Sequence, residues 1–107
     1  MIGNLFAGID DRAGDAEQVA EILTRPGARI ERIVSRGHAS PPGFWYDQPG
    51  SEWVVVLRGA ARLRFEDEPA ARTLSAGDCL EIAPHRRHRV DWTEPSEPTI
   101  WLAVHFG

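Results

Sequence analysis

The sequence predicts an all-β fold, a sandwich or barrel of short strands, from three observations. Apolar runs alternate with turn-forming residues at intervals of about eight to twelve residues. Residues 61–66 alternate cleanly, with Ala61, Leu63 and Phe65 on one face. Residues 53–57 form a continuous apolar run between glycines, which is typical of a strand buried on both faces.

The one predicted helix covers residues 15–24. Asp15 is a suitable N-cap, and Val19, Ile22 and Leu23 fall on one helical face. The Arg25-Pro26-Gly27 segment ends it. We expect this helix to be short and to pack against the outside of the main body.

From residue 28 onward the chain is predicted to consist of strands and turns. The predicted strands are residues 29–35, 44–48, 53–57, 61–66, 71–74, 79–82, 88–92 and 99–106. A loop separates the first two, because Pro41-Pro42 does not fit a sheet interior. The 107 residues are therefore expected to form a single domain (1–107), with residues 1–27 as an N-terminal extension and 28–107 as a β-barrel.

The composition excludes several classes of partner. The net charge is −4 and no block of basic residues occurs, so nucleic acid and anionic membranes are not expected as partners. No apolar stretch approaches the ~20 residues of a membrane span.

The cysteine content and the N-terminal sequence indicate the compartment. Cys79 is the single cysteine, so no intrachain disulfide can form and a reducing compartment is expected. The first residues lack the pattern of a secretory signal. We therefore expect a cytoplasmic protein. A lone cysteine on a strand after a turn is most often a small core residue, so we expect Cys79 to lie in the core.

Glu52 is the residue that most needs a chemical explanation. It stands at the head of the apolar run that ends at Arg58-Gly59. A carboxylate there must be paired, hydrogen-bonded or metal-bound, or its pKa rises. Glu52 is therefore a candidate functional group, with pairing to an arginine or tyrosine as the structural alternative.

Two stretches resemble the motifs of the cupins, which are small jelly-roll barrels. Glu52 and Gly59 match the second half of G-x5-H-x-H-x3-4-E-x6-G. Gly77 and His88 match the first glycine and the histidine of G-x5-P-x-G-x2-H-x3-N. The resemblance covers residues 30–106 and implies a double-stranded β-helix.

The resemblance also implies a metal site inside the barrel. In cupins, two histidines and the glutamate of the first motif bind a divalent metal together with the histidine of the second. Glu52 and His88 are the two positions that carry over directly, as metal ligands and as catalytic residues. For His88, a core histidine satisfied by one hydrogen bond is the alternative.

The first two histidines of the first motif are absent. Tyr46 and Gln48 occupy their places if three residues precede Glu52, and Trp45 and Asp47 if four do. Tyr46 and Gln48 share one strand face, and both are weaker ligands than imidazole. Asp47 faces the other way unless a bulge turns it inward.

Other departures and candidates remain open. The upstream histidine is His38, a loop residue that would have to reach the barrel mouth to complete a site. His105 faces the pocket if the Trp101 face of its strand lines the barrel. In the second motif, the proline, glycine and asparagine places are taken by Ala83, His85 and Trp92.

These residues leave three functions open. The first is a metal-dependent cupin enzyme of dioxygenase, isomerase or lyase type, using Fe, Mn, Ni or Zn. The second is a metal-free small-molecule-binding or sensor module, whose pocket would be walled by Trp45, Tyr46, Trp53 and Trp92. The third is a metal-free acid–base enzyme that uses Glu52 and His88. The resemblance to cupins also implies a homodimer.

Overall fold

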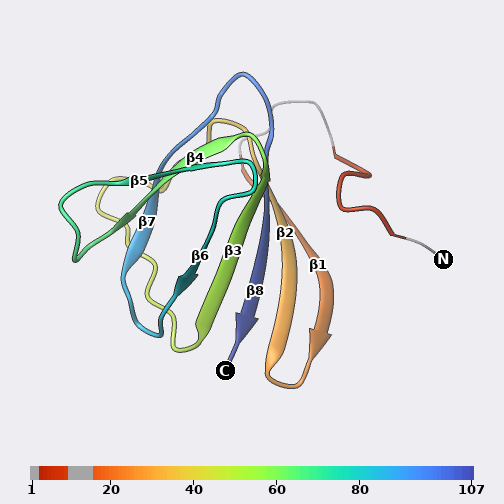
Figure 1. The fold of residues 1–107 in the computed structure, drawn as a ribbon, viewed down its shortest axis with the longest axis horizontal. Coiled ribbons are helices and arrows are strands. Elements are labelled where there is room, and N and C mark those ends of the chain that lie inside the picture. The colour runs from red at the N-terminus through yellow and green to blue at the C-terminus, as the bar shows by residue number, and fades with distance from the viewer. Residues whose placement is uncertain (1–2, 10–15) are drawn as a thin grey trace.

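The computed structural model describes residues 3–9 and 16–107, and within them the chain forms eight strands and no helix (Figure 1). The strands are β1 (Gln18–Arg25), β2 (Ala28–Ser35), β3 (Ser51–Arg58), β4 (Ala60–Phe65), β5 (Arg72–Ser75), β6 (Cys79–Ile82), β7 (His88–Thr93) and β8 (Thr99–Phe106). The predicted all-β class is confirmed. In these ranges no helix has the length and apolarity to span a membrane.

The strands form two antiparallel sheets. The larger has the order β1-β2-β8-β3-β6, and the smaller has the order β5-β4-β7. β8, the last strand in the chain, therefore lies in the middle of the larger sheet, between β2 and β3. This arrangement places β3 and β7, which carry Glu52 and His88, in different sheets.

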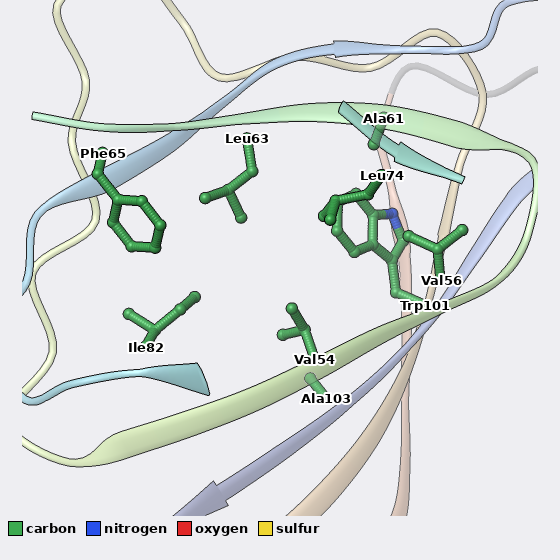
Figure 2. Packing of buried hydrophobic residues seen from close by; sticks show 9 residues of the cluster. All are labelled: Val54, Val56, Ala61, Leu63, Phe65, Leu74, Ile82, Trp101 and Ala103. Carbon is green, nitrogen blue, oxygen red and sulfur yellow. The ribbon is translucent and has the colours of Figure 1, made fainter. Parts of the chain in front are cut away.

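The hydrophobic core fills the space between the sheets (Figure 2). The larger sheet contributes Val54, Val56, Ile82, Trp101 and Ala103, and the smaller contributes Ala61, Leu63, Phe65 and Leu74. The predicted alternation along β4 is confirmed by this packing. The run at 53–57 is buried on one face only, because Val54 and Val56 enter the core while the intervening residues stay half-buried.

Gly59 joins the two sheets between β3 and β4. Its φ is +86°, and a Cβ there would lie 2.5 Å from Thr99 Oγ1 and 2.7 Å from Thr99 Cα. The motif glycine is thus required both by backbone conformation and by the close approach of β8.

The predicted N-terminal helix is wrong. Residues Gln18–Arg25 form β1, which pairs with β2 around the Pro26-Gly27 turn, and Asp15 lies outside the described residues. Gly27 has a φ of +78°, which suits the third residue of a tight turn between the paired strands β1 and β2. The bonds to β2 override the helical spacing of the apolar residues.

Two local predictions are also wrong. Residues 44–48 do not form a strand; Tyr46 makes one isolated bridge to His88. Cys79 is exposed rather than in the core, because it starts an edge strand with its side chain directed away from the opposite sheet.

Candidate functional site

Glu52 and His88 face each other across the two sheets. Glu52 lies near the start of β3 and is 7% exposed, and His88 starts β7 and is 4% exposed. Their Oε1 and Nε2 atoms are 3.9 Å apart. This distance is too long for a hydrogen bond between the two side chains.

The ring of His88 is held in one orientation by its other nitrogen. Nδ1 lies 2.9 Å from the backbone carbonyl oxygen of Arg86. A carbonyl oxygen only accepts, so Nδ1 carries the hydrogen and donates it. In neutral His88, Nε2 therefore keeps its lone pair on the side of Glu52.

The pKa of the Glu52 carboxyl group is shifted by its surroundings. Burial raises its pKa above the ordinary value of 4.5, and Glu31 adds to the rise. His105, His88 and a hydrogen bond with Gln48 act in the opposite direction without cancelling it. Burial therefore disfavours the ionised form of Glu52, whose Oε1 lies 3.9 Å from His88 Nε2.

Tyr46 forms one wall beside His88. Its backbone N–H donates to the His88 carbonyl oxygen at 2.7 Å, and the His88 N–H donates back at 3.1 Å. The two rings are stacked, with centroids 5.4 Å apart. Burial raises the pKa of the Tyr46 phenol, and Glu17 and Glu52 raise it further, so this hydroxyl remains a proton donor.

These groups line a cavity of about 310 Å³. Its apolar wall includes Val54, Leu63 and Ile82, and its polar groups include Glu17 and Gln48. The volume suits a small organic molecule. The cavity therefore combines an apolar wall with a few convergent polar groups.

A second histidine–carboxyl pair lies in the same cavity. His105 Nε2 is 2.9 Å from Glu31 Oε1, and Arg29 Nε is 3.4 Å from Glu31 Oε2. His105 is the β8 partner of Glu52 in the sheet register, and it lines the cavity with Trp101. The sequence reasoning missed Glu31 and Arg29. Their alternation along residues 29–35 put them on one strand face, but only the strand order brings that face beside Glu52.

Two predicted candidates lie elsewhere. His38 Nδ1 accepts from the Arg36 N–H, and its carbonyl accepts from Thr93, at the opposite end of β7 from His88. The Asp47 carboxylate is exposed and lies 2.7 Å from His85 Nδ1. His85, at the motif's glycine place, has a φ of +58°.

The three tryptophans that were predicted to wall the pocket, Trp45, Trp53 and Trp92, do not line this cavity. Trp92 lies under Arg62, with 4.8 Å between the guanidinium carbon and the ring centroid, and Trp45 lies beside Arg64 and Arg89. Of the four aromatic residues predicted to wall the pocket, Tyr46 lines it.

Of the predicted metal ligands, Tyr46, Gln48, Glu52 and His88 meet in this cavity, and His38 and Asp47 do not. Within residues 3–9 and 16–107, no group of three or more His, Cys, Asp or Glu side chains is arranged to hold a metal ion. Glu52 and His88 are two strong donors. Gln48 is engaged with Glu52, and the raised pKa of Tyr46 disfavours the phenolate that a metal would need.

Comparisons with known proteins agree with the fold. A family model described as "Cupin domain" matches residues 32–105. No curated protein matches the chain in a sequence search.

Solved structures include a relative of high identity. A protein of Ralstonia eutropha JMP134, provisionally named a mannose-6-phosphate isomerase, is 50% identical with a TM-score of 0.95, over 99% of this chain and 97% of that chain. A Klebsiella pneumoniae protein with a double-stranded β-helix domain is 18% identical, with a TM-score of 0.79 over 98% of this chain and 88% of that chain. The DMSP lyase DddQ of Ruegeria pomeroyi DSS-3 is 18% identical, with a TM-score of 0.72 over 91% of this chain and 52% of that chain. The last two likenesses concern the fold alone.

Proposed function

Since the chain belongs to the cupin family, we propose that it is a small-molecule enzyme that transfers protons beside a carbonyl group, as in an aldose–ketose isomerisation. One observation carries this proposal. A buried carboxyl group with a raised pKa lies 3.9 Å from an imidazole nitrogen whose lone pair faces it. Acid–base catalysis of this kind needs one group that donates a proton and one that accepts it, and we assign Glu52 as the donor and His88 as the acceptor.

In the first step His88 acts as the base and Glu52 as the acid. His88 Nε2 removes the proton from the carbon next to the carbonyl. The C–H electron pair forms a C=C bond, and the carbonyl π pair moves to oxygen, which takes the proton of Glu52. The product of this step is an enediol.

The second step returns both residues to their starting states. Glu52, now a carboxylate, removes the proton from the neighbouring enediol hydroxyl, and a new carbonyl forms there. The C=C electron pair takes the proton from His88 at the other carbon. Gln48 orients Glu52 throughout, and Tyr46 can donate a hydrogen bond to a substrate oxygen.

The Ralstonia eutropha relative supports the isomerase class. Its provisional name describes a sugar-phosphate isomerase, and it is 50% identical over nearly the whole of both chains. An isomerisation of this type needs an acid and a base at one end of a small cavity, which Glu52 and His88 can supply.

The metal-dependent alternative has less support from these residues. Cupins commonly bind divalent metals, but here Glu52 and His88 are the only strong donors of the predicted set in the cavity. We therefore expect untagged protein to contain well below one equivalent of Fe, Mn, Ni or Zn by elemental analysis. Stoichiometric metal that disappears in His88→Gln would support the metal-dependent enzyme instead.

Kinetics with mannose 6-phosphate and related hydroxy-carbonyl compounds test the proposal. Glu52→Gln and His88→Gln are each expected to lower kcat by about 10²–10⁴-fold, with a combined effect well below the product of the two. Chelator treatment should leave the rate unchanged. Ligand binding without turnover in the unaltered protein would favour the binding or sensor module.

We also propose that the protein is a homodimer. The edge strand β1 exposes Val19, Ile22 and Leu23 by 59%, 47% and 41%. A second copy would cover these side chains and the free edge. Light scattering should give twice the chain mass, and Leu23→Glu should shift it toward the monomer.

A further inference from the structure

A second, open hollow of about 500 Å³ lies outside the inner cavity. It is bounded by the β1–β2 turn, the end of β8 and the segment that leads into β3. Its lining includes Arg25 and Arg29 from the two sides of the turn.

Two arginines give this hollow its positive charge. Arg25 and Arg29 line it, and among the described residues no acidic side chain does. The inner cavity shares Arg29 with the hollow but is also lined by Glu17, Glu31 and Glu52. In a chain with a net charge of −4, this is a local reversal of sign.

Each of the two arginines has terminal N–H groups that its contacts with other described residues do not use. Arg25 Nη1 donates to the carbonyl oxygen of Thr24 at 2.8 Å, and Arg29 Nε lies 3.4 Å from Glu31. Within the described part of the chain, Arg25 Nη2 and the terminal nitrogens of Arg29 make no hydrogen bond or ion pair. A guanidinium with free terminal N–H groups is suited to a phosphate or carboxylate.

The hollow and the inner cavity meet at three residues. Arg29, Gln48 and His105 line both. Gln48 and His105 also act on Glu52, through a hydrogen bond and through charge. A molecule that extends from one space to the other would therefore pass Gln48 and His105, which neighbour Glu52.

We propose that the outer hollow is an anion subsite that binds the phosphate or carboxylate group of the substrate through Arg25 and Arg29. The reactive end of that substrate would lie in the inner cavity, and this part rests on the proposed function. Gly107 also lines the hollow.

Calorimetry with three sugars tests the subsite. Mannose 6-phosphate and glucuronate supply the two anions, and mannose supplies neither. At low salt we expect the better anionic sugar to bind at least about 10-fold more tightly than mannose, and its identity distinguishes phosphate from carboxylate. Arg25→Gln, which alters the outer hollow alone, should weaken that binding about 10-fold and leave mannose unaffected, and Arg29→Gln should weaken the anionic sugar more than it weakens mannose.

The matched control is Arg58→Gln. Arg58 is as exposed as Arg29 and contacts Glu97 at 4.0 Å, outside both cavities. Equal binding of all three sugars, or equal behaviour of the Arg25, Arg29 and Arg58 variants, would overturn the subsite.

Glu52→Gln and His88→Gln separate this proposal from the proposed function. Both variants should keep the anion preference while turnover falls. If turnover is unaffected in them but the preference depends on Arg25 and Arg29, the subsite stands and the acid–base assignment fails. If both variants lose turnover and the unaltered protein shows no anion preference, the acid–base assignment stands and the subsite fails.

Discussion

His88 Nε2 and Glu52 Oε1 lie 3.9 Å apart although they belong to opposite sheets. Their separation is therefore set by how the sheets pack, through the core between β3 and β4. Each residue is also held within its own sheet, Glu52 by the β8 and β6 ladders and His88 by the Arg86 carbonyl.

The raised pKa of Glu52 predicts a particular pH dependence of stability. Between its ordinary value of 4.5 and its raised value, the folded protein binds a proton that the unfolded chain does not. Rising pH therefore destabilises the fold through this window, by about 1.4 kcal/mol per unit of pKa difference. Urea unfolding of Glu52→Gln should show a stability gain over the unaltered protein that grows from pH 4 to pH 8.

Asp67 provides a control of opposite sign. A hydrogen bond from Arg86 lowers the pKa of its carboxyl group, so its stabilisation exists above the unfolded value and is lost in acid. Asp67→Asn should thus be the less stable protein at pH 7 and converge with the unaltered protein at low pH. A Glu52→Gln difference that stayed constant with pH would contradict a raised pKa.

Replacement of Gly59 should be among the most damaging single changes. Gly59→Ala combines a positive φ with contacts of 2.5 and 2.7 Å to Thr99, so we expect a loss of about 3 kcal/mol or more. Gly77→Ala is the matched control, because Gly77 has a φ of +92° and nothing within 4 Å of the added Cβ. It should cost about 1 kcal/mol, from backbone strain alone. Equal midpoints for the two variants in denaturant would show that the overlap with β8 is unimportant.

His85 should respond differently to two small replacements. Both His85→Ala and His85→Gly remove the contact with Asp47, but glycine tolerates the φ of +58°. The glycine variant should therefore be more stable than the alanine variant by about 1 kcal/mol in thermal or urea unfolding. The reverse order would mean that the left-handed backbone is not retained in solution.

Tyr46 should affect the proposed reaction through its hydroxyl and its ring separately. Tyr46→Phe keeps the ring that stacks on His88 and removes the proton donor. We expect kcat to fall about 10-fold with an unchanged unfolding midpoint. Tyr46→Leu also removes the stacking, so it should lower both kcat and stability. Loss of stability in the phenylalanine variant would assign the hydroxyl a structural role.

The sequence was sufficient to predict most of the fold because its patterns are local. Alternation in residues 61–66 and the bounds of 79–82 and 99–106 correspond to the strands observed. The prediction of a helix at 15–24 is wrong because it also used only local patterns. The spacing of Val19, Ile22 and Leu23 suits a helix locally, and pairing with β2 across Pro26-Gly27 decides otherwise.

Only those residues of the candidate site that occupy a motif position could be predicted from the sequence. Glu52 and His88 were chosen in this way, and the structure brings them together. His105 could be assigned only conditionally, and Glu31 and Arg29 not at all. Their proximity to Glu52 depends on β8 lying between β2 and β3, and no spacing along the chain encodes that order.

The central position of β8 has a consequence for biosynthesis. During translation β1, β2 and β3 emerge from the ribosome well before β8. β2 and β3 do not pair with each other, because each of them pairs with β8. Until β8 is synthesised, β2 and β3 therefore each have an unpaired edge that can pair with another chain. A polypeptide cut before Thr99 should aggregate rather than fold into a smaller version of the barrel.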